Sequence, residues 1–100
     1  MEKLFLLNPN FQDDTRGAGK SYFCPPCALI EGVLSLYPEL RKKLEIHHVD
    51  FVRPRPSIIE LIGENNQSCP VLIKTDGTFI NDPDLILDYL AKKYGIGYAH

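Results

Sequence analysis

The sequence lacks the features that mark membrane, secreted and nucleic-acid-binding proteins. Its formal net charge of −2 gives no electrostatic reason to expect nucleic acid or a membrane surface as a partner. No apolar run approaches the roughly 20 residues that span a bilayer. The apolar run near the N-terminus, residues 4–7, is too short for the core of a signal peptide. We therefore expect a cytoplasmic protein.

Cysteine is also scarce. The chain has 3 cysteines, and this odd number excludes a disulfide framework that pairs all of them within one chain. In the cytoplasm thiols are mostly kept reduced. Each cysteine is nevertheless the neighbour of a proline, in the stretches "FCPPC" (residues 23–27) and "SCP" (residues 68–70). This placement indicates a role beyond packing.

What the chain does contain is enough for one globular domain over residues 1–100. It is 44% hydrophobic and 24% charged, which is ordinary for a soluble domain, and it shows no repeat or linker. Apolar periodicity and turn signals predict four strands and three helices. The strands are expected at residues 3–8, 44–52, 71–74 and 78–81, and the helices at 24–37, 58–65 and 84–94. This β-α-β-α-β-β-α order predicts an α/β fold with a mixed four-stranded sheet and helices on both faces.

The C-x-x-C pair carries the clearest chemical signal. Cys24 is expected at a helix N-terminus, where the partial positive charge and free N–H groups favour thiolate over thiol. Cys27, one turn further on, would lie deeper and could resolve a mixed disulfide. Pro25 and Pro26 fit the first turn, where their missing N–H groups cost nothing. The pattern favours thiol chemistry, although a bare C-x-x-C also occurs without any.

Together these segments resemble the thioredoxin fold, and within it the glutaredoxins and the N-terminal domain of glutathione transferases. The resemblance rests on "FCPPC", on "SCPVLI" and on the C-terminal "INDPDLILDYLAKKYG". The chain also resembles a small family of uncharacterised bacterial thioredoxin-like proteins. The resemblance implies thiol-disulfide exchange with protein or small-molecule thiols as partners. It also implies that Pro70 is cis and that the residue before it, Cys69, faces the C-x-x-C and offers its backbone to substrates.

Cys69 has three interpretations at this stage. It is a small buried hydrophobic residue, a third redox thiol, or one ligand of a metal or Fe–S site formed with Cys24 and Cys27. In the last case the fourth ligand would come from a second copy of the chain in a homodimer or from a small thiol. The alternative function is accordingly a non-catalytic binding domain, and a further one is a transferase-like scaffold without redox activity.

Four other charged residues are candidates for binding glutathione or another substrate. Asp82 and Pro83 stand where similar transferases carry an acid or amide followed by Ser, so the acid is kept but the hydroxyl that would help hold glutathione is lost. Asp84 fits the acidic N-cap of the last helix. Arg53 and Arg55 lie on the side where related folds bind anions, and either bind a substrate carboxylate or form surface salt bridges.

Two further patterns bear on the site. His47 and His48 are adjacent in a strand, so they point to opposite faces and cannot hold one metal together. The polar, Gly-rich residues 9–23 lack phosphate-loop spacing, and we expect them to form a long loop draped over the active site.

Overall fold

Strand β1 (Glu2–Leu7) is an inner strand of the sheet. Its side chains alternate between the two faces of the sheet, and both faces are buried along this strand. The computed structural model describes all 100 residues. The sheet has the order β2-β1-β3-β4, with β1 parallel to β2 and antiparallel to β3, and with β3 antiparallel to β4. The other strands are β2 (Leu44–Val49), β3 (Val71–Ile73) and β4 (Phe79–Ile80), and the helices are α1 (Pro25–Leu36), α2 (Leu40–Lys43), α3 (Pro56–Ile62) and α4 (Pro83–Tyr94).

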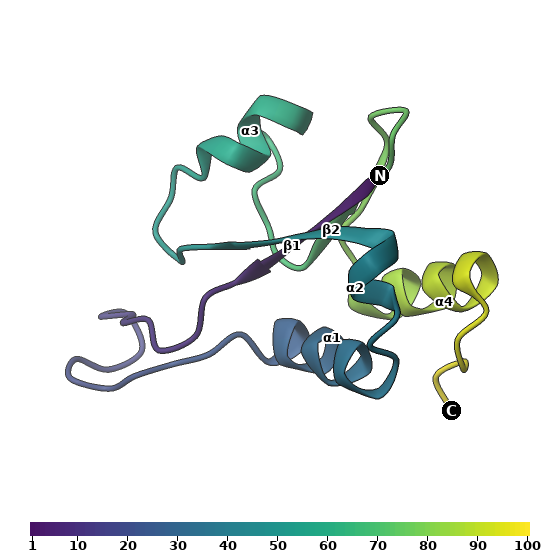
Figure 1. Ribbon diagram of the computed structural model, residues 1–100. Coiled ribbons are helices and arrows are strands. Elements are labelled where there is room, and N and C mark those ends of the chain that lie inside the picture. Colours follow the sequence, from purple (N-terminus) through teal and green to yellow (C-terminus); the bar gives the residue numbers. More distant parts are fainter.

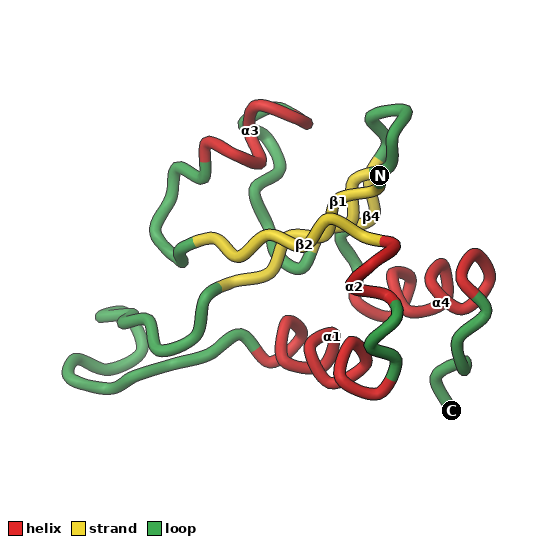
Figure 2. The backbone as a smooth tube through the Cα atoms, in the orientation of Figure 1, coloured by secondary structure: helices red, strands yellow, loops and turns green.

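The predicted fold class is confirmed, with the order β-α-β-α-β-β-α and a mixed four-stranded sheet that is consistent with a thioredoxin-like topology. Helices α1 and α4 lie on one face of the sheet and α3 lies on the other (Figures 1 and 2). The one-turn helix α2, between α1 and β2, was not expected. None of the helices is both long and apolar enough to cross a membrane.

The two faces of the sheet bury very different amounts of apolar material. A cluster of 13 buried residues fills the space between the sheet, α1 and α4, and includes Leu4 and Leu6 of β1. A cluster of 4 buried residues lies under α3: Phe5, Ile58, Val71 and Ile73. We call these the large core and the small core.

Helix α4 begins one residue earlier than expected, which corrects the assignment of its cap. Asp82, not Asp84, is the N-cap, and its carboxylate accepts the N–H of Leu85 at 3.0 Å. Pro83 then takes the first helical position, where it has no N–H to satisfy. Gly95 ends the helix with a φ of 73°.

Two other elements have bounds that differ from those expected. Helix α3 begins at Pro56, two residues before its expected start, and Arg55 is its N-cap residue. Strand β2 ends at Val49, so residues 50–52 lie in the connection to α3. In α4 the buried residues are Ile86, Leu87, Leu90 and Ala91, and Leu85 is exposed.

A buried carboxylate fastens β1 to α4. Glu2 is 4% exposed and accepts hydrogen bonds from the hydroxyls of Tyr89 and Tyr94, while the Lys93 ammonium lies 3.1 Å from one carboxylate oxygen. Burial opposes ionisation of Glu2, but these three donors outweigh it and the pKa of Glu2 is lowered. The carboxylate is therefore held in its charged form.

Candidate functional site

The thiol of Cys24 lies at the start of α1. Because the next two residues are prolines, only one backbone N–H group of the first turn is available to donate a hydrogen bond to this thiol. Cys24 is the N-cap of the helix, and Pro25 and Pro26 follow it without N–H groups. The N–H of Cys27 is thus the first amide hydrogen of the helix, and it points to Cys24 Sγ at 3.3 Å. The Cys24–Cys27 pair near the N-terminus of α1 is compatible with a C-x-x-C motif.

The second thiol is enclosed. Cys27 is 3% exposed, belongs to the large core, and accepts the N–H of Leu7 at 3.5 Å through its sulfur. Burial raises the pKa of Cys27 far above its ordinary value, and the hydrogen bond and negative charge of Cys24 raise it further. The two thiols of the pair therefore differ sharply in access: Cys24 is half-buried and Cys27 is buried.

The third thiol lies on the facing loop. The Cys69–Pro70 peptide bond is cis, which confirms the expectation for Pro70. The Cys24 thiol points toward the carbonyl oxygen of Cys69 at 4.0 Å. Cys69 is half-buried and packs against both cores. Burial raises the pKa of its thiol to about 11, although the charges of Arg55 and Arg53 act in the opposite direction.

All three thiols are free in this structure. The chain contains no group of three or more His, Cys, Asp or Glu side chains arranged to hold a metal ion. The shared metal or cluster site expected as an alternative for Cys24, Cys27 and Cys69 stays a prediction, as does glutathione binding.

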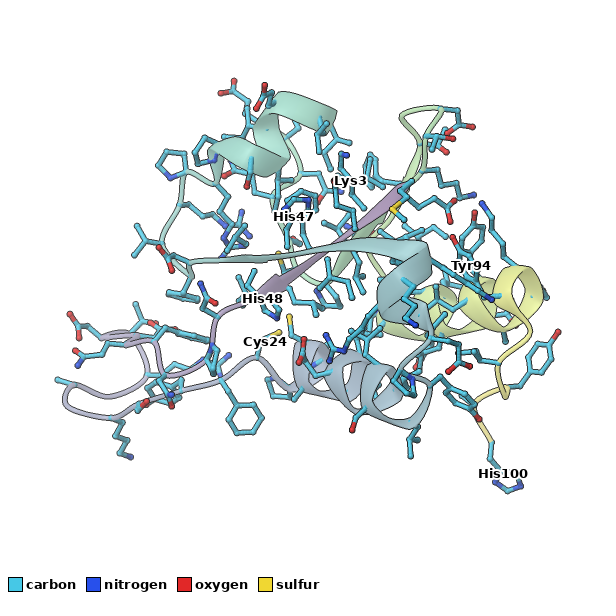
Figure 3. The ribbon with its side chains drawn as sticks, viewed as in Figure 1. Lys3, Cys24, His47, His48, Tyr94 and His100 are labelled. Carbon is cyan, nitrogen blue, oxygen red and sulfur yellow. The ribbon has the colours of Figure 1, made fainter.

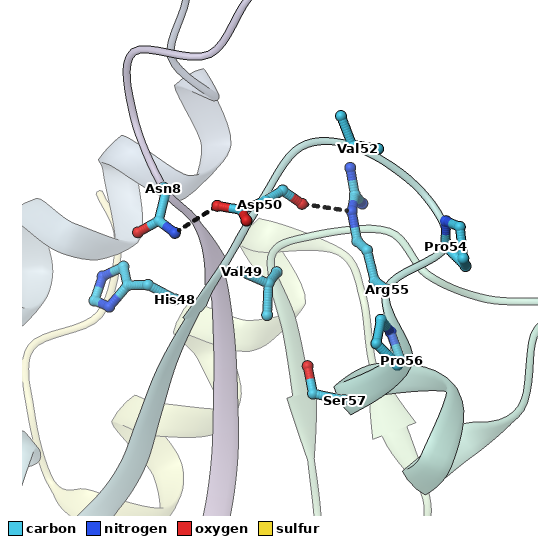
Figure 4. A pocket seen from close by; sticks show the side chains of 9 residues that line it. All are labelled: Asn8, His48, Val49, Asp50, Val52, Pro54, Arg55, Pro56 and Ser57. Atoms are coloured by element: carbon cyan, nitrogen blue, oxygen red, sulfur yellow. Dashed lines mark hydrogen bonds between the residues drawn. The ribbon is translucent and has the colours of Figure 1, made fainter.

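Arg55 is buried in the structure, which contradicts the expected surface salt bridge, whereas its binding of a substrate carboxylate stays a prediction. It is 5% exposed, and its guanidinium donates to the backbone carbonyls of Asp50, Phe51 and Gln67. Arg55 therefore forms no surface salt bridge; it holds the connection after β2 to the segment before Cys69. Figure 4 shows the Asp50 bond at the edge of a pocket of about 370 Å³ that contains no cysteine. Arg53 is exposed, and its peptide bond to Pro54 is a second cis bond, which was not expected.

The remaining expected residues lie as follows. Asp82 caps α4, and Asp84 is an exposed residue of the first turn of that helix. His47 and His48 point to opposite faces of β2, as expected (Figure 3). His47 stacks on Phe5, with the two ring centroids 4.8 Å apart, whereas His48 contacts the carboxylate of Glu31 in α1 at 3.0 Å.

Two pockets meet at Cys24. One, of about 270 Å³, is lined by both Cys24 and Cys27 and by the Glu31–His48 pair. The other, of about 230 Å³, is lined by Cys24 and by residues of the segment 9–23, together with Phe51. The exposed ring of Phe23 borders both pockets. The long segment between β1 and α1 thus forms part of the surroundings of the exposed thiol.

Comparison with known proteins gives a family but no activity. Residues 1–98 match the model described as "Protein of unknown function (DUF3088)". The chain belongs to this family. No curated protein and no solved structure matches it.

Sequence reasoning missed two parts of this DUF3088 chain's site. The first is the Arg55 anchor, meaning the buried guanidinium and its three backbone acceptors. An arginine between two prolines gives no sign in the sequence that it is buried. The second is the aromatic wall beside Cys24, formed by Phe11, Tyr22, Phe23 and Phe51. Aromatic residues inside an otherwise polar, Gly-rich segment were a signal for this wall, because a solvated loop has no need of large apolar side chains.

Proposed function

We propose that the chain is a thiol-disulfide oxidoreductase of the thioredoxin or glutaredoxin type that uses the Cys24–Cys27 pair. The observation that carries the proposal is the arrangement around Cys24 Sγ. A half-buried sulfur accepts the first amide hydrogen of α1 at 3.3 Å and lies 4.0 Å from the carbonyl oxygen that precedes cis Pro70. A second thiol lies one helical turn away and is buried.

In the first step Cys24, as a thiolate, attacks one sulfur of a substrate disulfide. The substrate S–S bond breaks, and one substrate thiolate leaves with the bonding electron pair and takes a proton from water. A new S–S bond joins Cys24 to the other half of the substrate. Cys24 is the attacking group because Cys27 is enclosed by the large core and cannot meet an external disulfide.

In the second step Cys27 loses its proton to water and attacks Cys24 Sγ. The mixed disulfide breaks, the second substrate thiolate leaves and is protonated, and a Cys24–Cys27 disulfide forms. The substrate disulfide has then gained two electrons and two protons, and the pair has lost them. Two molecules of a low-molecular-weight thiol, or one dithiol protein, restore the reduced pair by supplying two electrons and two protons, and are themselves oxidised to a disulfide.

The high pKa of Cys27 is compatible with this order of events. Two of its causes, the hydrogen bond with Cys24 and the charge of Cys24, act while Cys24 is a thiolate. In the mixed disulfide the sulfur of Cys24 carries no charge, so the pKa of Cys27 falls at the stage where Cys27 attacks. The N–H of Leu7 then stabilises the Cys27 thiolate.

The test compares the wild-type protein with the variants Cys24→Ser, Cys27→Ser and Cys69→Ser. Turnover of a low-molecular-weight disulfide is followed with excess dithiothreitol, after subtraction of the rate without protein. We expect turnover in the wild type and in Cys69→Ser, and none in Cys24→Ser. In a second experiment each reduced protein, freed of dithiothreitol, is mixed with the disulfide and its intact mass is measured. Cys27→Ser should accumulate a species heavier by one substrate half, whereas the wild type should lose two mass units as the Cys24–Cys27 disulfide forms. Turnover that survives in Cys24→Ser, or a Cys27→Ser variant that forms no mixed disulfide at any pH, contradicts the proposal.

A further inference from the structure

The smaller pocket beside Cys24 has an aromatic wall. It has a volume of about 230 Å³, and 6 of the 9 residues that line it are hydrophobic. Phe11, Tyr22 and Phe23 come from the segment before α1, and Phe51 comes from the connection after β2. The sulfur-bearing residue Cys24 belongs to the same lining. A ligand in this pocket therefore lies against aromatic rings and next to the half-buried thiol.

The wall is fixed before any ligand arrives. The rings of Phe11 and Phe51 are stacked, with centroids 4.3 Å apart and planes within 3° of parallel. The backbones of Phe11 and Tyr22 exchange two hydrogen bonds, of 3.0 Å and 2.8 Å. The long segment that leaves β1 is thus held at its base, and from there it projects away from the sheet before it returns to the start of α1 (Figures 1 and 3). A preformed wall binds at a lower entropic cost than a mobile one.

The pocket is lined by one cation, Arg16, and one anion, Asp13, and of the two only the cation has a side chain without a hydrogen-bond partner within the chain. Arg16 lines the pocket, and its guanidinium makes no hydrogen bond or salt bridge within the chain. The carboxylate of Asp13, the other charged residue of the lining, already accepts the N–H and the hydroxyl of Thr15. One cation is therefore available without a partner, and a carboxylate is a suitable partner for a guanidinium.

We propose that this pocket binds one arm of a low-molecular-weight disulfide, an arm that consists of an aromatic ring carrying a carboxylate. The ring lies against Phe11 and Phe23, the carboxylate meets Arg16, and the sulfur meets Cys24 Sγ. The volume admits one such arm, so the other arm remains in solvent and leaves as the thiolate when Cys24 attacks. The inference rests on the thiol-disulfide exchange proposed above, and it names the substrate class of that site.

The test uses four small disulfides that separate ring from charge. Dithiobis(nitrobenzoate) has both features, dithiodipyridine has the ring alone, dithiodipropionate has the carboxylate alone, and hydroxyethyl disulfide has neither. In a Cys27→Ser/Cys69→Ser background only Cys24 reacts, and its bimolecular rate constant is measured with each probe. Dividing the rate constant of each pocket variant by that of the parent cancels the intrinsic reactivity of the probe.

The pocket variants are Phe23→Ala and Arg16→Gln, and their matched controls are Leu29→Ala and Lys20→Gln. Leu29 is 47% exposed on α1, and Lys20 is an exposed cation of the same segment; neither lines the pocket. Phe23 is 59% exposed, so its truncation should leave the fold intact. The two control variants should leave all four rate constants within about twofold of the parent.

We expect Phe23→Ala to slow the two aromatic disulfides about threefold to tenfold and to leave the two aliphatic ones unchanged. Arg16→Gln should slow the two carboxylates about twofold to fivefold at low ionic strength, and added salt should abolish the difference. An equal effect on all four probes overturns the inference, and so does a control variant that matches its pocket variant.

A polypeptide ligand is a distinct outcome. If a disulfide-linked peptide without aromatic residues loses as much rate through Phe23→Ala as dithiobis(nitrobenzoate) does, the pocket belongs to a polypeptide-binding face and the inference is overturned. A Cys24 that reacts with none of the probes contradicts the proposed thiol exchange itself. A Cys24 that reacts with every probe without discrimination contradicts the inference alone.

Discussion

The two faces of the sheet are held by different means. The face under α1 and α4 is closed by the large core of 13 buried residues, and Glu2 fastens β1 to α4 at its edge. The face under α3 has the small core of 4 buried residues, and the guanidinium of Arg55 holds the segments that flank α3. Because fewer apolar contacts hold it, we expect the α3 face to open more readily.

The thiols lie across the boundary between these faces. Cys27 belongs to the large core, whereas Cys69 packs against both cores and follows the segment that Arg55 holds. The C-x-x-C is thus built on the more stable side, and the cis-proline loop that faces it is positioned partly by the less stable side. This division predicts that mutations on the two faces have separable effects on stability and on the geometry of the site.

The largest effect should come from the large core. Leu90 is fully buried, and Leu90→Ala should lower the free energy of unfolding by about 2–5 kcal/mol because it leaves a cavity in a well-packed region. Ile58→Ala in the small core should cost less, since the thin layer under α3 can collapse around the gap. Urea denaturation measures both. Leu85→Ala, at a residue 60% exposed in α4, is the control. Equal losses at Leu90 and Ile58 would remove the distinction between the faces.

The next effect concerns Arg55. Arg55→Met keeps much of the side-chain volume but removes the donors to three backbone carbonyls, and we expect a loss of about 2–3 kcal/mol. Hydrogen exchange should accelerate in α3 and in the segments on either side of it, while α1 and α4 keep their protection. The exposed Arg53→Met is the matched control. If hydrogen exchange accelerates equally on both faces, Arg55 stabilises the whole fold and not the α3 face alone.

A smaller effect, with a defined pH dependence, should come from Glu2. Glu2→Gln should cost about 1–2 kcal/mol at neutral pH, because the charged acceptor of Tyr89, Tyr94 and Lys93 is lost. Since folding lowers the pKa of Glu2 below its ordinary value of 4.5, the unfolded chain binds a proton at higher pH than the folded chain does.

The contribution of Glu2 is therefore complete above pH 4.5 and declines as the pH falls from there through the folded pKa. Urea denaturation of the wild type and of Glu2→Gln across this range should show the difference between them shrinking toward acid pH. A difference that stays constant with pH would mean that the charge of Glu2 does not contribute.

The smallest measurable effect should come from the cap of α4. Asp82→Ala removes the acceptor of the Leu85 N–H and should cost about 0.5–2 kcal/mol, whereas Asp84→Ala should cost less. Thermal unfolding compares the two variants. Because Asp82 caps a helix, its loss should leave the rate of the proposed thiol exchange per folded molecule unchanged. A large drop in that rate without a loss of stability would return Asp82 to a role in substrate binding.

Sequence patterns predicted the fold well because it follows from local signals. The apolar run of β1, the prolines at the start of α1, and the Asp76-Gly77 turn between β3 and β4 each act within a few residues. The N-cap of α4 was missed because two acids flank Pro83, and only the position of that proline in the first turn decides between them.

The site was predictable only in part, for a physical reason. Cys24, Cys27 and cis Pro70 belong to short motifs, whereas the Arg55 anchor and the Phe11–Phe51 stack join residues that are distant in the chain. A charged residue between prolines is read as exposed, and burial with three backbone acceptors becomes visible only in three dimensions. The position of the third thiol was expected from the resemblance, but its contact with both cores was not.

The central claim is that Cys24 and Cys27 form a reversible two-electron couple from which Cys69 is excluded. The most direct measurement equilibrates the wild-type protein in a series of dithiothreitol redox buffers, alkylates the remaining thiols after acid quenching, and maps each sulfur by mass spectrometry. We predict a single two-electron transition, a disulfide that joins Cys24 to Cys27, and an alkylated Cys69 throughout. Three free thiols in every buffer, or a disulfide that includes Cys69, would contradict the claim.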